Sequence, residues 1–561
     1  MNGGAWRFAQ LDEFWVHYQP LTPWGKDEAQ AQTVLVDRHT IESRFDDIDG
    51  VLSLMEALAG EPSALDRLSY HLRRMPRVPL ERKEAYELLE LFQFKKFMAN
   101  YRGVAATLRS REAASHWLPS IEGTSNAGLL AAELDRGGSD PETFYIADVY
   151  DPALAAARAG IAAADEAVGI ERVKAEAATR LEYGLSFDGR EFVVAPRDVA
   201  RTMAEAGGRW TVEPYDDTRY IVRIAPSAAA IDAMADRARF LEDERIAEAR
   251  VVDRISAVAG AAVPDLLAMV AAVTRLDRAR ASAVLAREFG MSRPVLDSGV
   301  TRLVGARFVP CADECGRLGL SYTPLTSEFA ADAIVLFGSN MGGKTVVLKT
   351  LLFMQLLAQS GNFVPATRFE TQVYARVEYV GELAGERLTG LSGFGLELWR
   401  LIAARDVPLA TFEGGPRGSD GGALLAFDEL ARTTGSHEAE ALLSAVVEAY
   451  ASSHGDRAFF ATHFRGIARM PGVEYRRMRG LDRAAAEMHL GHLFDGAPGA
   501  GRPLAERLAG INRSMRYEVL PDDGADVESD ALAIASFLGL EKHIVERARY
   551  YLMKGSFRES R

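Results

Sequence analysis

A phosphate-binding sequence pattern lies in the second half of the chain. The apolar run Ala333–Phe337 (AIVLF) leads directly into residues 338–345 (GSNMGGKT), and a helical run follows at 346–359. The spacing G-x-x-x-x-G-K-[ST] therefore occurs in the strand–loop–helix setting that phosphate binding requires. Glycines let backbone N–H groups surround phosphate oxygens, and the helix N-terminus adds unpaired donors and a favourable dipole. The pattern predicts an ATP-binding loop formed by Gly338, Ser339, Asn340, Met341, Gly342, Gly343, Lys344 and Thr345.

Specific roles follow for the polar side chains near this loop. Lys344 is predicted to meet the β- and γ-phosphates, and the Thr345 hydroxyl to coordinate Mg²⁺. A second apolar run, 423–427 (ALLAF), ends in Asp428 and Glu429, and a third, 458–461, is followed closely by His463. Strand ends at one sheet edge are where ligands collect in α/β folds. We therefore expect Asp428 to hold Mg²⁺ through water and Glu429 to act as general base. His463 is expected to sense the γ-phosphate and orient the attacking water.

The composition is that of a folded protein with several domains. The 561 residues are 48% apolar and 26% charged, with a formal net charge of −14. An acidic total argues against a surface coated with nucleic-acid-binding residues, although it permits a local basic face. Two basic runs are compatible with either a phosphate-binding track or a solvated helix face. They are Arg73, Arg74, Arg77, Arg82 and Lys83, and Lys95, Lys96, Arg102, Arg109 and Arg111.

Cysteine content and hydropathy bear on the compartment. Cys311 and Cys315 are the two cysteines, too few for a four-ligand zinc site, and their role stays open. Scarce cysteine fits a reducing compartment, and the N-terminus lacks a signal-peptide pattern. The most apolar stretch, 257–273, contains Pro264 and Asp265, so we expect a packed helix there and no membrane span. These features predict a cytoplasmic protein without membrane association.

Periodicity divides the chain into helical and mixed segments. Apolar residues recur every three or four positions over about 35–114, and 152–181 is a second helical block. Short β-prone runs lie at 187–196 and 210–226. Helical periodicity returns over 227–288, a span long enough for two or three extended helices. From about residue 293, short strands alternate with helices, which indicates an α/β sheet.

Four segments resemble the MutS family of DNA mismatch repair ATPases. They occur in family order over about residues 293–555, and the resemblance becomes weaker toward the N-terminus, where 40–98 looks like the start of the family's helical core. One departure is the absence of a family glycine near Arg432. The four segments are 338–345 with its Asn-Met-Gly-Gly-Lys core, 359–366 (QSGNFVPA), 428–442 (DELARTTGSHEAEAL) and 461–464 (ATHF).

The resemblance implies a dimer with composite sites. Residues 391–401 (LSGFGLELWRL) look like the family segment whose serine, here Ser392, opens a helix and touches the γ-phosphate of the partner subunit. A serine at a helix N-terminus is a sound anion contact. Phe308 is expected beside the adenine. The ligands implied are ATP and Mg²⁺, and the assembly implied is a homodimer with composite ATP sites.

The predicted fold is a multidomain α + α/β protein with a P-loop (ABC-type) ATPase domain. Its parts are an N-terminal segment (1–35), a helical core (36–150), helical lever arms (151–292) with a β-containing clamp insert (about 182–226), the ATPase domain (293–515) and a C-terminal helical dimerisation segment (516–561).

Two functions are compatible with this architecture. The first is a clamp on duplex or branched DNA without wedge-type mismatch reading, since the helical core begins within about forty residues of Met1 and no Phe-x-Glu motif precedes it. The second resembles short MutS-like factors that reactivate adenosylcobalamin-dependent lysine or ornithine aminomutases. Acidic charge fits the second, but no residue points to cobalamin. We favour DNA slightly because the arms of the family generally hold DNA.

Overall fold

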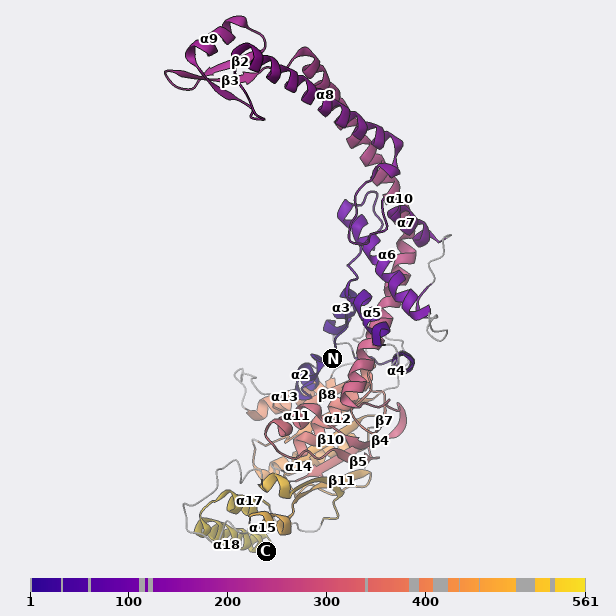
Figure 1. Ribbon diagram of the computed structural model, residues 1–561. Coiled ribbons are helices and arrows are strands. Elements are labelled where there is room, and N and C mark those ends of the chain that lie inside the picture. Colours follow the sequence, from indigo (N-terminus) through magenta and orange to yellow (C-terminus); the bar gives the residue numbers. More distant parts are fainter. Residues whose placement is uncertain are drawn as a thin grey trace. The chain divides into compact units, whose positions relative to one another are not determined.

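The chain forms two compact units. The computed structural model describes residues 3–31, 34–58, 62–109, 117–119, 125–338, 342–382, 393–406, 422–432, 434–453, 455–490, 510–524 and 530–559. The first unit consists of Met1–Pro62 with Thr274–Arg561, and the second of Ser63–Val273 (Figure 1). The expected single helical core, 36–150, is therefore divided. Its first helix, α4 (Arg38–Ala57), belongs to the unit that carries the phosphate loop.

A six-stranded sheet organises the first unit. Its order is β12-β11-β6-β10-β9-β8, and every pairing is parallel except that of the edge strand β12. All five residues of β6 are buried, as expected of a parallel strand covered on both faces. The strands are β6 (Ala333–Phe337), β8 (Arg376–Val380), β9 (Ala423–Asp428), β10 (Arg457–Thr462), β11 (Val473–Leu481) and β12 (Met515–Pro521).

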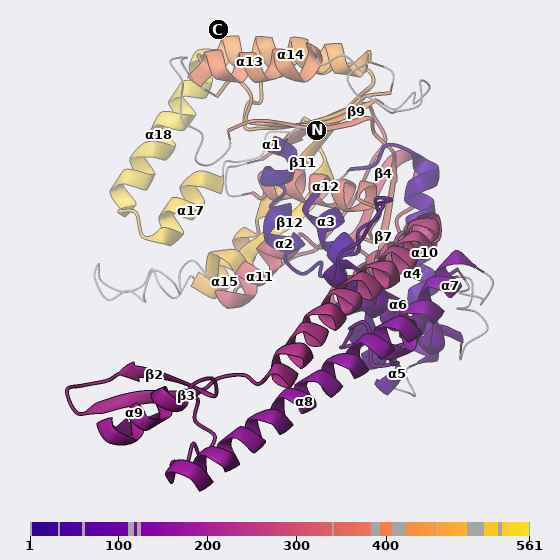
Figure 2. The same ribbon diagram turned by 90° about the horizontal axis from the view of Figure 1, so that it is seen from above.

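Helices cover both faces of this sheet. Helix α12 (Lys344–Gln359) packs against β8, β9 and β10, and nearly all of its residues are buried. Helix α14 (Ser436–Ala451) packs on the other face, where Ala439, Leu443 and Val447 join the core of β6, β9 and β10 (Figure 2). Helix α13 (Gly393–Asp406) packs against β8. The strand–loop–helix order predicted at 333–359 is confirmed.

The N-terminal residues are part of the first unit. They form α1 (Gly3–Phe8), α2 (Leu11–Trp15) and α3 (Pro23–Ala31). Asp277, which is fully buried, anchors them: its carboxylate accepts hydrogen bonds from the backbone N–H of Leu21 at 2.8 Å and of Thr22 at 2.7 Å. The Thr22 hydroxyl donates to the same carboxylate at 2.8 Å. A buried carboxylate satisfied by several donors holds this segment firmly in place.

A smaller antiparallel sheet and the C-terminal elements complete the first unit. The sheet order is β5-β4-β7, with β4 (Asp297–Ala306), β5 (Leu325–Phe329) and β7 (Arg368–Gln372). The helices α11 (Val309–Arg317), α15 (Arg483–Leu490), α17 (Asp530–Leu538) and α18 (Lys542–Glu559) belong here too. The expectation of an entirely helical segment from 516 onward is wrong at its start, because β12 continues the large sheet to Pro521.

The second unit joins helices to a small β-containing body. Its helices are α5 (Pro62–Arg73), α6 (Leu88–Arg109), α7 (Asn126–Asp135), η2 (Asp148–Tyr150) and α8 (Pro152–Tyr183). The predicted insert contains the antiparallel sheet β1-β3-β2, with β1 (Val193–Pro196), β2 (Trp210–Pro214) and β3 (Arg219–Ile224). The sequence did not indicate α9 (Arg197–Ala206), whose Ala200 and Met203 fill the core of the insert beside Trp210.

Residues 228–289 form one helix, α10 (Ala228–Phe289), so the expectation of two or three helices is wrong. Pro264 lies inside it on an exposed side, where its ring meets solvent. Buried neighbours such as Ala259 and Leu266 hold the helix on both sides of the proline. Among the described helices, α10 alone is long and apolar enough to cross a bilayer, and half of its most apolar window is buried inside the protein. Core helices of soluble proteins share these properties.

Candidate nucleotide site

Three neighbouring strands end at one edge of the large sheet. β10 lies between β6 and β9, and the register pairs Thr462 with Phe337 and Ala461 with Asp428. The residues after β6, at the end of β9 and after β10 therefore emerge side by side. The backbone N–H of Glu429 donates to the Ala461 carbonyl at 2.9 Å and continues the pairing one residue past Asp428. Parallel pairing thus brings the three predicted polar clusters together.

Two glycines of the loop, Gly338 and Gly343, are closely surrounded. Gly343 has φ of 91°, a left-handed conformation that side chains disfavour, and a Cβ there would lie 3.0 Å from the Tyr517 ring. A Cβ on Gly338 would lie 3.0 Å from Cγ of Met478. Strands β11 and β12 thus press side chains against the loop. Ser339, Asn340 and Met341 lie outside the described residues.

Lys344 and Asp428 hold charges in a desolvated environment. The Lys344 ammonium is 3% exposed, donates to the Gly338 carbonyl at 2.7 Å and lies 4.0 Å from Glu429 Oε1. Burial lowers the pKa of Lys344 and raises the pKa of Asp428. The Thr345 hydroxyl lies 3.4 Å from Asp428 Oδ1. Each group is thus disfavoured in its charged form, and bound phosphate and Mg²⁺ would supply the opposite charges.

Glu429 lies among basic side chains. Its oxygens are 4.0 Å from Lys344 Nζ, 3.8 Å from His463 Nδ1 and 3.7 Å from an Arg432 nitrogen. Glu429 has φ of 54° and Ala431 of 64°, so the turn after β9 is left-handed at two residues that are not glycine. Such backbone costs free energy and persists where surrounding contacts determine it. Here it directs the Glu429 carboxylate toward the start of α12.

Two residues of this site were not predicted. Glu397 on α13 accepts the backbone N–H of Ala431 at 2.9 Å, and burial raises the pKa of its carboxyl. Arg432 approaches Glu429 and also contacts Glu382 at 2.7 Å. The only sequence signal for Glu397 is an acidic residue on a helix, a feature too common to single it out. Together the two residues brace the left-handed turn.

The remaining predicted contacts stay predictions. Phe308 is 1% exposed, with its ring edge-on to Phe353 at 5.5 Å, so it lies in the protein interior. Ser392 lies outside the described residues. Cys311 and Cys315 are unpaired by disulfide on α11, and burial raises the pKa of Cys311 to about 11. That thiol is therefore protonated at neutral pH.

The side chains of the site fit a magnesium ion that is held mainly by the phosphates of a bound nucleotide. Within the described residues, no three His, Cys, Asp or Glu side chains gather into a metal site. Mg²⁺ keeps several waters and is usually bound through one or two protein oxygens and substrate phosphates. Thr345 and Asp428 supply hard oxygens of this kind at neighbouring positions. The donor set therefore suits Mg²⁺ bound together with phosphates.

A phosphate-loop pattern at a parallel strand end, helices on both sheet faces and a separate helical unit define a multidomain protein of mixed helical and α/β type. Comparison with known proteins narrows this class: residues 334–554 match the family described as MutS domain V. This segment of the chain therefore belongs to the MutS domain V family.

Relatives in this family match different lengths of the chain. Endonuclease MutS2 of Caldicellulosiruptor saccharolyticus is 27% identical over 54% of this chain and 33% of its own length. DNA mismatch repair protein MutS of Caulobacter vibrioides is 31% identical over 44% of this chain and 26% of its own. MutS of Natronomonas pharaonis is 26% identical over 92% of this chain and 56% of its own. The chain thus spans from about a quarter to just over half of these relatives.

Replacing Asp428 with asparagine is expected to stabilise the metal-free protein at neutral pH. The folded state raises the pKa of this carboxyl, so it binds the proton more tightly than the unfolded state. That stabilisation is complete below the unfolded pKa and is lost as pH rises through the folded pKa, which leaves an unfavourable charge at pH 7. We predict a higher Tm for Asp428→Asn in EDTA, and loss of the further rise that Mg²⁺ and ADP give the wild type.

Asp297→Asn serves as the matched control. Asp297 is an exposed carboxylate paired with Arg38, so its replacement should change the Tm little. A lower Tm for Asp428→Asn in EDTA would contradict the electrostatic account of the site.

Proposed function

We propose that this protein binds ATP with Mg²⁺ and hydrolyses it at the edge of the large sheet. One observation carries the proposal: parallel pairing of β6, β10 and β9 gathers the predicted hydrolytic set within one small region. The set consists of Lys344, Thr345, Asp428, Glu429 and His463.

Each side chain has a distinct task in this proposal. Lys344 would exchange its contact with the Gly338 carbonyl for the β- and γ-phosphates, whose negative charge offsets the cost of burying the ammonium group. Thr345 and Asp428 would hold Mg²⁺, which would supply positive charge to the phosphates. Glu429 accepts the proton of the attacking water, and His463, 3.8 Å from it, orients that water. The left-handed turn fixes Glu429 before the substrate arrives.

A homodimer with composite sites is part of the proposal. Helix α13 begins at Gly393, directly after Ser392, and its Trp399 and Ile402 are 60% and 55% exposed. Large apolar side chains exposed together are typical of protein contact surfaces. Tyr550 and Tyr551 on α18 are also exposed. These features support a dimer in which the partner subunit covers α13. Ser392 would then contact the γ-phosphate bound in the site of the partner subunit.

Variants of the two principal residues separate binding from hydrolysis. Glu429→Ala should retain ATP binding but lower the steady-state hydrolysis rate by about a hundredfold or more, since it removes the general base. Lys344→Ala should weaken binding itself. Nucleotide binding by calorimetry and phosphate release test both. Normal turnover by Glu429→Ala would exclude the assigned base.

Mixing two inactive variants tests the composite site. A heterodimer of Ser392→Ala and Glu429→Ala contains one site with both defects and one intact site. If subunits exchange freely and the sites act independently, an equal mixture should recover about a quarter of wild-type activity, because half of the dimers then have one intact site of two. Each variant alone serves as its control. No recovery after verified exchange would contradict the contribution of Ser392 in trans.

We further propose that ATP binding and hydrolysis close and open the second unit on DNA. The relatives named as DNA mismatch repair proteins and MutS2 endonucleases support a DNA-related role. Arg190 and Arg197 of the insert are exposed arginines without a carboxylate partner among the described residues. They are the best-placed candidates for phosphate contacts there.

A protein client is the second candidate, favoured by the surface of the insert. Residues 182–226 contain six arginines, eight carboxylates and no lysine, a formal charge of −2. Four arginines are paired: Arg201, Arg209, Arg219 and Arg223 contact Glu205, Glu182, Asp216 and Glu213. Phe192, Val194 and Tyr215 are at least 40% exposed.

The basic runs of the second unit are also partly neutralised, since Arg74, Lys83, Lys96 and Arg102 pair with carboxylates. The surface of the insert therefore suits an apolar contact with a protein client. A cobalamin-dependent aminomutase is one such client.

A salt series on DNA binding distinguishes the two clients. If DNA is bound at the insert, replacing Arg190 and Arg197 with glutamine should reduce the slope of log affinity against log salt by roughly two, as expected when two phosphate contacts are lost. Arg201→Gln with Arg209→Gln is the matched control, because these arginines are already paired. Anisotropy of labelled duplex and branched DNA, with ATPase rates in parallel, measures this.

Absence of DNA binding at low salt, with intact ATPase activity, would exclude the DNA proposal. A purified cobalamin-dependent aminomutase is then the next client to test. If the aminomutase stimulates the ATPase rate of the wild type but not that of Phe192→Ser and Tyr215→Ser variants, the apolar surface is supported as the contact.

A further inference from the structure

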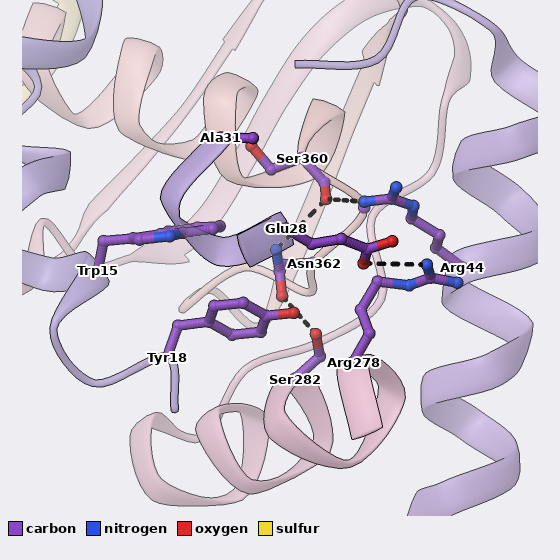
Figure 3. Close-up of a pocket in the computed structure, with 10 residues that line it drawn as sticks. Trp15, Tyr18, Glu28, Ala31, Arg44, Arg278, Ser282, Ser360 and Asn362 are labelled. Carbon is purple, nitrogen blue, oxygen red and sulfur yellow. Dashed lines mark hydrogen bonds and ion pairs between the residues drawn. The ribbon is translucent and has the colours of Figure 1, made fainter. Parts of the chain in front are cut away.

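A cavity of about 140 Å³ lies in the first unit, away from the strand ends that form the nucleotide site. It is lined by the N-terminal helices, α4, the first-unit part of α10 and the residues that directly follow α12 (Figure 3). The volume is roughly five times the ~30 Å³ that one water molecule occupies in the liquid. A small molecule or several waters would fit, whereas a nucleotide would not.

Two arginines line this cavity without adequate acidic partners. Arg44 donates to the Ser360 carbonyl at 3.2 Å and pairs with no carboxylate among the described residues. Arg278 has only long contacts, 3.4 Å to Glu28 and 3.6 Å to Asp47. Asp47 is itself held at 2.9 Å by both its oxygens through Arg275. The wall therefore has an excess of positive charge.

The two guanidinium groups affect each other. Burial, and then the nearby charge of Arg278, lower the pKa of Arg44. Glu28 is the single acidic residue that lines the cavity, and its side chain is 43% exposed. Since Arg275 already holds Asp47, Arg44 and Arg278 have only Glu28 and a share of Asp47 to balance them, which is unfavourable for partly buried cations unless another anion is present.

Neutral hydrogen-bonding groups line the same space. The Ser360 hydroxyl is buried without a hydrogen-bond partner in the described part of the chain. The Tyr18 hydroxyl is directed into the cavity, and burial raises its pKa to about 12, so it remains a donor at neutral pH (Figure 3). Trp15 and Tyr18, with ring centroids 4.9 Å apart, form an aromatic wall. Donors, cations and an apolar surface thus face one enclosed volume.

We propose that this cavity binds a small oxyanion, a phosphate or carboxylate group carried by a compact molecule. Guanidinium groups match the oxygens of both in geometry and charge. Ser360 and Tyr18 would donate to the remaining oxygens, and the ring of Trp15 would cover the organic part of the ligand. Glycine at 361 is required for this arrangement, since a Cβ there would collide with the Arg44 side chain.

A purely structural role for Arg44 predicts a different outcome. Its contact with the Ser360 carbonyl lies at the C-terminal end of α12, where a cation is favourable. Such a role explains one hydrogen bond, but neither the second arginine nor the unsatisfied Ser360 hydroxyl. A structural arginine stabilises the ligand-free protein, whereas an arginine that awaits an anion does not.

The test measures Tm and calorimetric binding with inorganic phosphate, acetate or malonate, each against KCl at equal ionic strength. All proteins carry Lys344→Ala, which weakens anion binding at the phosphate loop. We expect phosphate or a carboxylate to raise the Tm, and the anion that acts distinguishes the two ligand classes. Adding Arg44→Gln should weaken binding by about tenfold or more, while the ligand-free Tm stays level or rises.

Arg302→Gln is the matched control, because it removes a cation of the same unit that is already paired with Glu328 and Glu370. It should retain the anion-dependent rise in Tm. If Arg44→Gln fails to fold, Arg278→Gln and Tyr18→Phe provide the same comparison. The proposal is overturned if no anion raises the Tm beyond KCl, or if the rise persists in folded variants of the cavity. A fall in the ligand-free Tm with unchanged anion binding also overturns it, since it indicates a structural arginine.

Discussion

Parallel pairing of β6, β10 and β9 is the constraint on which the first unit depends. These strands are almost entirely apolar and buried, so polar residues can appear only where they end. Because the strands run in the same direction, those ends lie at one edge. The same burial that stabilises the sheet also desolvates Lys344 and Asp428, which leaves both poorly compensated in the free protein. Stability of the sheet and readiness for a phosphate–metal ligand therefore have one physical origin.

The local chemistry could be predicted from the sequence because it depends on patterns of a few residues. The apolar run at β6, the loop glycines and the residues at the ends of β9 and β10 are all local signals. Other features are decided by long-range packing. The continuity of α10 through Pro264 depends on the buried side of that helix, and β12 depends on pairing with β11. Glu397 acts through a backbone N–H of a distant turn, and the arginine cavity joins segments more than three hundred residues apart. No local pattern reports such contacts.

The two units carry different kinds of surface. The exposed apolar side chains of the first unit include Trp399 and Ile402 on α13 and Tyr550 and Tyr551 on α18. In the second unit, the insert combines paired charges with exposed apolar side chains and two arginines that have no carboxylate partner among the described residues. The candidate nucleotide-site residues Lys344, Asp428 and Glu429 lie in the first unit, whereas the insert belongs to the second.

Contacts from β11 and β12 to the loop glycines limit how the protein can be shortened or recombined. Met478 and Tyr517 fill the space that side chains at 338 and 343 would need, so loop and C-terminal strand form one fitted pair. A fragment ending before Met515 would lose the Tyr517 ring and leave β11 as an edge strand with unsatisfied backbone groups, open to association with other chains. In a chimera, β12 must come from the same parent as the loop. A fragment that keeps the loop and its fitted strands together must therefore extend at least through Pro521.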